Sequence, residues 1–260
     1  MALIAIAVYD TEENKRTELT RRTLESLTFT LDLTRHRVFL IDNASCEETK
    51  ELLRAYSREY TVITNEINIG TAEAINLAWR HRKPGEHAVK MDNDVVIYSQ
   101  TWADELEEAI RRDPKAGIVG LKRKDCIETP WQDGFYKSFL FMFPHLPGER
   151  WVLGERVYHV MGTCQMYNSA LLDKIGYLYQ PRLYGFDDAL AAKRCELAGF
   201  YSAFLPHIEI DHIDPGDTAY QGWKEKHAGE DMATYSRIVN EYVNGKRPIY
   251  YNPFQNQGVL

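Results

Sequence analysis

The sequence has no long hydrophobic run, and its longest apolar stretches are only as long as a β-strand. Since a membrane-spanning helix needs about 20 apolar residues, no segment is expected to cross a bilayer. The N-terminal segment MALIAIAVYD has no basic leader and runs into acidic residues, so we interpret it as a strand and not as a signal peptide. We therefore expect a cytoplasmic protein, with contact to a membrane surface left open for the C-terminal helical segment.

Cysteines, basic clusters and nucleotide-binding glycines are also scarce. Cys46, Cys126, Cys164 and Cys195 show no C-x-x-C spacing, which argues for reduced thiols over a disulfide framework or a zinc site. The net charge of −7 disfavours nucleic-acid binding, because phosphate contacts need clustered Lys and Arg. No G-x-G-x-x-G follows the first expected strand, which disfavours a dinucleotide-dependent oxidoreductase.

The sequence does contain a regular alternation of apolar, β-rich segments with helix-forming segments. Strands are expected at residues 2–9, 36–41, 60–64, 87–91 and 116–121, and helices at residues 11–27, 46–58, 71–82 and 102–112. With 44% hydrophobic and 27% charged residues, the 260-residue chain can bury a core. The alternation predicts an α/β fold, a single Rossmann-like domain whose mostly parallel central sheet is flanked by helices.

The pattern is less regular between residues 122 and 160, where aromatic residues, Gly and Pro are frequent. This region is expected to form a small β excursion, which is either an exposed substrate pocket or an ordinary packed β segment. Regular elements then return, with a regular segment at 160–167, helices at 169–175 and 187–198, a strand at 201–210 and a mostly helical segment at 217–243.

Asp92, Asn93 and Asp94 directly follow the fourth expected strand. Open α/β sheets bind their ligands at the carboxyl ends of their strands. Two carboxylates one residue apart on a bend can face the same Mg²⁺ or Mn²⁺, which bind one or two carboxylates together with phosphate oxygens. The alternative is an Asx-rich turn that caps the strand and holds no ligand.

A second acidic pair, Asp187 and Asp188, opens the helix expected at 187–198. The helix dipole stabilises acids at this position, so capping is the alternative to a catalytic role. His212 lies at the end of the last expected strand, whereas His207, its competitor, lies in the middle. Imidazole is a common ligand for such cations, although an isolated histidine is more often structural.

Four short segments stand at the expected strand and helix ends: IDNAS at 41–45, NIGTAEAIN at 68–76, MDNDV at 91–95 and FDDALAAKR at 186–194. In this order they resemble motifs of the family 2 glycosyltransferases of GT-A fold, including the rhamnosyl- and galactofuranosyltransferase-like members. The resemblance spans roughly residues 3–213. In the family these motifs contact the nucleobase, lie near the donor, bind the metal and supply the catalytic base, respectively.

The resemblance implies a metal site and a set of substrate contacts. Asp94 is the implied direct ligand, with Asp92 at the metal, its water or the ribose, and His212 as a further ligand six residues after a proline. The implied donor-binding residues are Val8, Tyr9, Asp10, Asp42, Asn68, Gly70, Asn76, Asp92 and Asn93, and the implied acceptor-binding residues are Trp131, Gly162 and Tyr184.

The resemblance also implies a catalytic base, which is Asp188 with Asp187 as the alternative. The chain departs from the family pattern at this segment, because Asp187 stands where Glu is usual and Leu190 where a further acid is usual. It departs again where residues 8–10, Val-Tyr-Asp, replace a Pro-Tyr-Asn-like turn. Nucleobase choice and acceptor contacts are therefore less defined than the metal and base assignments.

The expected function is that of an inverting, metal-dependent hexosyl- or pentosyltransferase that uses Mn²⁺ or Mg²⁺. Its donor would be a nucleoside-diphosphate sugar, and the favoured nucleoside diphosphates are UDP and dTDP. Its acceptor would be a hydroxyl of a glycan, lipid-linked glycan or other glycoconjugate. The alternative is a catalytically degenerate protein that binds nucleotides or sugars. A sugar-nucleotide pyrophosphorylase is disfavoured, because its Gly-rich N-terminal loop with Arg and Lys is absent.

The expected domain is one glycosyltransferase unit over residues 1–245. It would consist of a donor half at 1–121, an acceptor and catalytic half at 122–213, and a C-terminal helix at 214–245, followed by a tail at 246–260.

Overall fold

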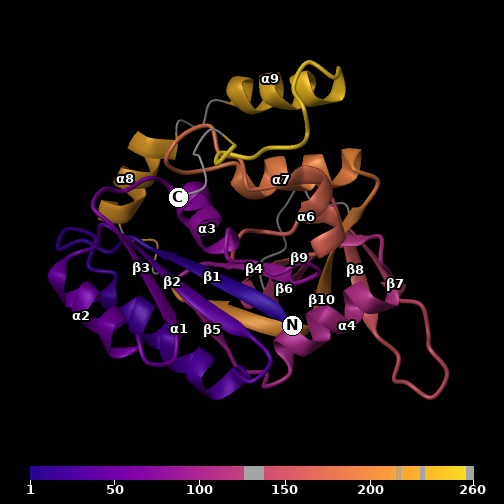
Figure 1. Cartoon of the computed structure of the whole chain (residues 1–260), viewed down its shortest axis with the longest axis horizontal. Coiled ribbons are helices and arrows are strands. Elements are labelled where there is room, and N and C mark those ends of the chain that lie inside the picture. The colour runs from indigo at the N-terminus through magenta and orange to yellow at the C-terminus, as the bar shows by residue number, and fades with distance from the viewer. Residues whose placement is uncertain (126–137, 215, 217, 229–231, 256–260) are drawn as a thin grey trace.

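A ten-stranded mixed sheet runs through the protein, with helices on both of its faces (Figure 1). The computed structural model describes residues 1–125, 138–214, 216, 218–228 and 232–255. The strands are β1 (Ala2–Val8), β2 (Arg37–Asn43), β3 (Thr61–Asn65), β4 (His87–Met91), β5 (Val95–Ile97), β6 (Ala116–Arg123), β7 (Phe139–Met142), β8 (Leu153–Val157), β9 (Cys164–Tyr167) and β10 (Tyr201–His212). The helices are α1 (Thr17–Thr30), α2 (Glu47–Ala55), α3 (Thr71–Trp79), α4 (Trp102–Arg112), α6 (Ser169–Ile175), α7 (Asp187–Leu197), α8 (Thr218–Ala228) and α9 (Met232–Val243).

The N-terminal half of the sheet is parallel, as the alternation predicts. β1 pairs in parallel with β2 and β4, and β2 pairs in parallel with β3. Ile4 and Ile6 of β1 enter one hydrophobic core with residues of α1, α2 and α4, whereas Leu3 and Ala5 enter another with residues of α3, α6 and α7. Because β1 is covered on both faces, successive side chains on either side of the strand are buried, and its sequence ALIAIAV is apolar throughout.

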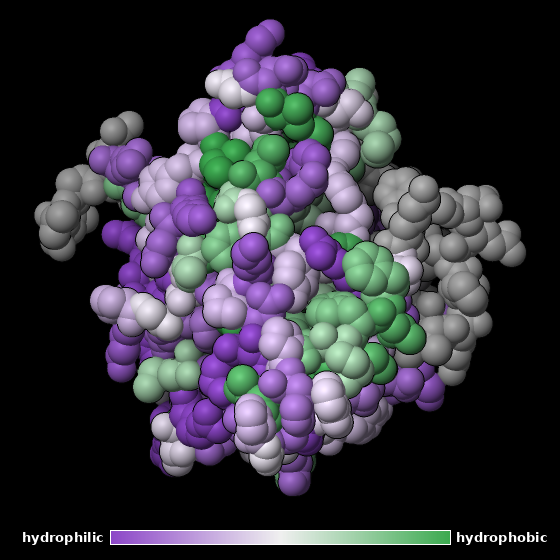
Figure 2. All heavy atoms as spheres, turned by 90° about the vertical axis from the view of Figure 1, so that its right-hand side faces the viewer, coloured by the Kyte–Doolittle hydropathy of each residue, from purple (hydrophilic) through white to green (hydrophobic). Residues whose placement is uncertain are grey.

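The second half of the sheet is mixed. β9 lies between β4 and β6 and is antiparallel to both, and the strand order is β3-β2-β1-β4-β9-β6-β10-β8-β7. Residues 122–160, where a β excursion is expected, include β7 and β8, which pair antiparallel at the end of the sheet. Phe139, Leu140 and Met142 of β7 are exposed there, and Figure 2 shows hydrophobic residues gathered on this side of the molecule.

The long strand β10 changes partners along its length. Its pairing with β6 is interrupted between Leu205 and Glu209, around Pro206, which has no N–H to donate to a neighbouring strand. The last residues of β10 also pair antiparallel with β5, so that His212 stands opposite Val95. The end of β10 therefore lies beside the segment that follows β4, which contains the two carboxylates of the D-x-D sequence.

Two helical regions differ from the expected ones. The helix expected at 11–27 begins only at Thr17, because residues 11–16 form a turn in which the Asn14 side chain accepts a hydrogen bond from the Thr11 N–H (2.7 Å). The helical segment expected at 217–243 contains two helices, α8 and α9. α9 packs on α7 through a small apolar cluster that includes Leu190, Ile238 and Tyr242.

The described part of the chain can be compared with two expectations from composition, on membrane-spanning helices and on disulfides. None of its helices combines the length and the apolar character that a membrane crossing requires. Cys46, Cys164 and Cys195, the cysteines it contains, form no disulfide.

Candidate active site

A cavity of about 430 Å³ lies at the carboxyl ends of β1 and β4. It brings together most of the residues singled out in the sequence, namely Val8, Tyr9, Asn68, Asp92, Asn93, Asp94, Gly162, Tyr184, Asp187, Asp188 and His212. A second hollow of about 820 Å³ includes Met1 and His87 at the amino ends of the same strands, and it contains none of those residues. Since open α/β sheets bind ligands at the carboxyl ends of strands, the first cavity is the candidate active site.

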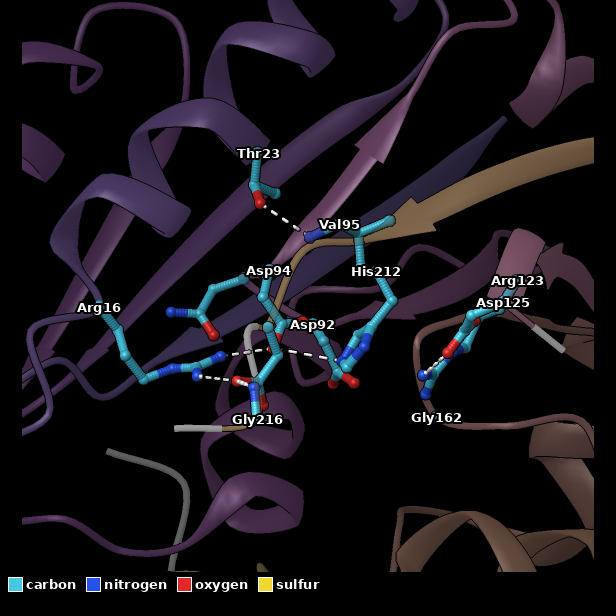
Figure 3. A network of polar contacts seen from close by, with 12 residues as sticks. Arg16, Thr23, Asp92, Asp94, Val95, Arg123, Asp125, Gly162, His212 and Gly216 are labelled. Carbon is cyan, nitrogen blue, oxygen red and sulfur yellow. Dashed lines mark hydrogen bonds and ion pairs between the residues drawn. The ribbon is translucent and has the colours of Figure 1, made fainter. Parts of the chain in front are cut away.

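Asp94 and His212, which line this cavity, form a candidate cation site together with Asp214. One ligand atom from each lies within 4.8 Å of the others, and the Nε2 of His212 lies 3.4 Å from the Oδ2 of Asp94 (Figure 3). Asp94 is buried, and its Oδ1 has no hydrogen-bond partner among the described residues. Buried polar atoms are normally paired, so this oxygen is a ligand atom that a cation would satisfy.

The charge of Asp94 is favoured by its neighbours. Burial alone would raise the pKa of this carboxyl, but the hydrogen bond and charge of His212 and the charge of Arg16 outweigh burial and hold the pKa below its ordinary value. An ionised carboxylate is what a hard divalent cation requires.

Asp92 has a different partner from Asp94. Its carboxylate lies 3.4 Å from the Nζ of Lys90, a buried lysine of β4 that also lies 3.1 Å from the carboxylate of Asp187. Burial raises the pKa of Asp92 above its ordinary value although Lys90 opposes this rise. Asp92 therefore lines the cavity beside Lys90 and is not in the Asp94–His212–Asp214 group, and its role as a metal ligand stays a prediction.

The two acids at the start of α7 have different surroundings. Asp187 is buried and paired with Lys90, whereas Asp188 is half-buried and accepts a hydrogen bond from the backbone N–H of Gly162 (3.0 Å). Phe186, directly before the helix, has a left-handed backbone (φ 63°), which is uncommon for a residue other than glycine. This turn places both acids at the cavity that they line.

Gly162 holds this arrangement in place. Its carbonyl accepts a hydrogen bond from the Nζ of Lys90 (3.2 Å), and a Cβ at this position would lie 2.4 Å from the same nitrogen. A larger residue would therefore push Lys90 away from its acidic partners. Gly162 and Tyr184 line the cavity, whereas Trp131 lies outside the described residues.

Four of the expected donor contacts lie outside the lining of the cavity, and two of them are acids. Asp10 is buried and accepts a hydrogen bond from the side chain of Asn93 (2.9 Å), and burial raises the pKa of Asp10 to about 6 although its hydrogen bonds oppose the rise. Asp42 is also buried, and its carboxylate accepts a hydrogen bond from the backbone N–H of Ser45 (2.8 Å). Neither residue belongs to the cavity lining.

Gly70 and Asn76, the other two expected donor contacts outside the lining, contact the backbone of the segment that precedes Tyr184. The amide of Asn76 exchanges two hydrogen bonds with the backbone of Leu178, each 2.9 Å long. Gly70 has a positive φ of 89°, and a Cβ there would lie 3.0 Å from the carbonyl oxygen of Leu183. Both residues therefore position the segment that leads to Tyr184.

Comparison with known proteins identifies the family. The model of the family described as "Glycosyl transferase family 2" matches residues 4–176, which is more than half of the chain. The chain belongs to glycosyl transferase family 2. A search of curated proteins finds no match.

Solved structures show the fold of this member of glycosyl transferase family 2. The mannosyltransferase PcManGT from Pyrobaculum calidifontis, in complex with GDP-Man and Mn²⁺, has a TM-score of 0.63 at 17% identity over 86% of this chain and 59% of that chain. GalNAc-T7 with UDP, GalNAc and Mn²⁺ has a TM-score of 0.60 at 15% identity over 82% and 44%. S. aureus TarS 1-349 in complex with UDP-GlcNAc has a TM-score of 0.58 at 18% identity over 94% and 72%. The GT-A fold predicted from the sequence is confirmed, and the chain spans little more than half the length of the first of these proteins.

The candidate active site also contains residues that the sequence analysis did not predict. Lys90 is a charged residue inside an apolar strand, a signal that could have been recognised, because buried lysines need an acidic partner. Asp214 follows His212 at a spacing of two, another available signal. Other missed residues include Arg16, Asn43 and, on α8, Tyr220, Trp223 and Lys224.

α8 adds an aromatic wall to the cavity. The Trp223 ring lies 5.3 Å from that of Tyr9 and 6.0 Å from that of Tyr184, measured between ring centroids. These three aromatic residues come from three distant parts of the chain. Such contacts depend on the tertiary fold, so no local pattern could have revealed them.

Proposed function

We propose that the protein is an inverting, divalent-cation-dependent glycosyltransferase. It would transfer a hexose or pentose from a nucleoside-diphosphate sugar, with UDP or dTDP as the first candidates, to a hydroxyl of a glycan or other glycoconjugate. The observation that carries the proposal is that one cavity is lined both by Asp94 and His212, which form a candidate cation site with Asp214, and by the carboxylate of Asp188. The first offers ligands to a cation and the second can accept a proton.

The ligand atoms of the candidate cation site suit a divalent cation such as Mn²⁺ or Mg²⁺. Two carboxylates and an imidazole stand close together, and the buried Oδ1 of Asp94 has no hydrogen-bond partner among the described residues. Asp94, His212 and Asp214 would hold the ion, which supplies positive charge to the diphosphate as it leaves. The Mn²⁺ in the complexes of PcManGT and GalNAc-T7 supports this choice of metal.

Asp188 would act as the general base. Its Oδ2 accepts the hydrogen bond of the Gly162 N–H, and the side chain lines the cavity. The acceptor hydroxyl would give its proton to the Asp188 carboxylate while its oxygen forms a bond to the anomeric carbon. The bond from that carbon to the diphosphate breaks with its electron pair going to the diphosphate, and attack opposite the leaving group inverts the anomeric centre.

The lining of the cavity suits a nucleotide donor. Tyr9, Asn68 and Asn93 lie near the ends of the strands and can contact the nucleoside, whereas Asp187 is held by Lys90 and is the alternative base. Gly162, Tyr184 and Trp131 remain the proposed acceptor contacts. The proposal includes action in the cytoplasm, on a glycan or on a lipid-linked acceptor.

A test is the release of nucleoside diphosphate from a panel of nucleotide sugars in the presence of Mn²⁺ and candidate acceptors. Asp188→Asn should lower turnover on the order of 100-fold or more without weakening donor binding, because it removes only the proton acceptor. Glu196→Gln, an exposed change on the same helix, is the matched control and should keep full turnover. Full activity of Asp188→Asn together with an inactive Asp187→Asn would show that the base is assigned to the wrong acid. Donor binding without turnover in the wild type would instead indicate the alternative of a binding protein.

A further inference from the structure

Arg16 inserts its guanidinium into the candidate cation site. This residue precedes α1 and is 3% exposed. One terminal nitrogen contacts the Oδ2 of Asp94 (Figure 3). The other lies 3.1 Å from the Oδ1 of Asp214. Two of the three candidate metal ligands are therefore already bound by a cation that belongs to the chain itself.

Neighbouring residues keep the Arg16 guanidinium in this position. Its central carbon lies 3.9 Å from the centroid of the Tyr220 ring, a distance at which a cation is attracted to an aromatic face. The Nζ of Lys224 lies 3.0 Å from the other oxygen of Asp214. Both residues come from α8, so the helix and the guanidinium together close this side of the site.

Both acidic ligands are paired with cationic side chains of the protein itself. Arg16 contacts Asp94 and Asp214, and Lys224 pairs with Asp214. The Oδ2 of Asp94 contacts the Arg16 guanidinium and lies close to His212, so a divalent cation bound to this oxygen would lie beside the guanidinium. Like charges repel strongly in a buried site. A bound diphosphate brings negative charge, which would allow the metal and Arg16 to stay together.

We propose that Arg16 is an internal counter-cation of the metal site, which competes with the divalent cation for Asp94 and Asp214 until a nucleoside diphosphate binds. The inference rests on the proposed function, because it requires that site to hold a metal. It predicts that metal binding and diphosphate binding are strongly coupled, each increasing the affinity of the other. Arg16 would then leave the carboxylates and contact the diphosphate.

Calorimetric titration with Mn²⁺, without and with UDP, tests this inference. Without UDP, Arg16→Gln should bind Mn²⁺ on the order of tenfold or more tightly than the wild type, because the competing charge is gone. Arg16→Lys keeps the charge and should stay near the wild type. Arg21→Gln, which removes a half-exposed arginine of α1, the helix that follows Arg16, is the control and should not change the affinity. Addition of UDP should raise the Mn²⁺ affinity of the wild type more than that of Arg16→Gln.

Equal Mn²⁺ affinities for the wild type and Arg16→Gln would overturn the role of Arg16 and leave the proposed metal site intact. Failure of every variant to bind Mn²⁺, with or without any nucleoside diphosphate, would overturn both. The wild type gives a second readout that does not depend on a stable variant. The side-chain NMR signal of the Arg16 Nε–H should shift when Mg²⁺ and UDP are added together, and an unchanged signal at saturation would contradict the inference.

Discussion

Lys90→Met should lower the free energy of unfolding by about 3–5 kcal/mol, because it removes the cation from a buried ion pair and leaves the acid behind. The side chain of Lys90 is 4% exposed and that of Asp187 is 10% exposed, with 3.1 Å between the charged atoms. Burial alone would lower the pKa of Lys90, but the charges of Asp187 and Asp92 outweigh it and raise the pKa well above its ordinary value. The lysine is therefore charged in the folded protein, and methionine keeps much of its length without its charge.

Urea unfolding, followed by circular dichroism, measures this loss. Arg54→Met is the matched control, because its pair with Glu47 is exposed on both sides and should contribute at most about 1 kcal/mol. The double variant Lys90→Met/Asp187→Asn should recover part of the loss, since a neutral amide no longer needs a buried cation. A loss for Lys90→Met no larger than that of Arg54→Met would refute the reasoning.

Two further predictions concern one residue behind the cavity lining, Asp10, and one residue of the lining, His212. Burial raises the pKa of Asp10 from 3.8 to about 6, so the folded protein binds this proton more tightly than the unfolded chain does. Stability should therefore fall by about 3 kcal/mol in total as the pH rises from about 3, below the pKa in the unfolded chain, to about 7, above the pKa in the folded protein. Asp10→Asn should remove this part of the pH dependence in urea unfolding, and an unchanged pH profile would contradict it. His212→Ala should weaken Mn²⁺ binding in calorimetry more than His207→Ala does, because His207 is hydrogen-bonded to Glu105 (2.7 Å) and lies outside the candidate site. Equal effects would show that His212 is not a ligand.

The fold is predictable from the sequence where a local pattern determines it. The alternating apolar and helix-forming segments are sufficient for the parallel part of the sheet around β1, since both of its faces are buried. The antiparallel insertion of β9 between β4 and β6 has no such local signal, because it depends on which strand edges are left to pair. α1 begins later than its sequence pattern suggests, because the Asn14 turn competes with the helix for backbone hydrogen bonds.

The sequence predicts part of the cavity lining, but it misses Lys90 and the residues of α8, and it does not predict how the side chains pair. The spacing of Asp92 and Asp94 predicts that both face one cation, yet one lies beside Lys90 and the other beside Arg16. The direction of a side chain after a bend depends on partners that are distant in sequence. Asp214 differs in this respect, because its spacing of two from His212 is a local signal in the sequence.

The most direct test of the proposed function is calorimetric binding of UDP, dTDP and GDP, each with and without Mn²⁺, to the wild type and to Asp94→Ala. The account predicts that the wild type binds at least one of these diphosphates in the presence of Mn²⁺, and that omission of the cation or loss of the Asp94 carboxylate greatly weakens this binding. Equal binding by Asp94→Ala, or binding by the wild type that does not depend on the cation, would contradict it.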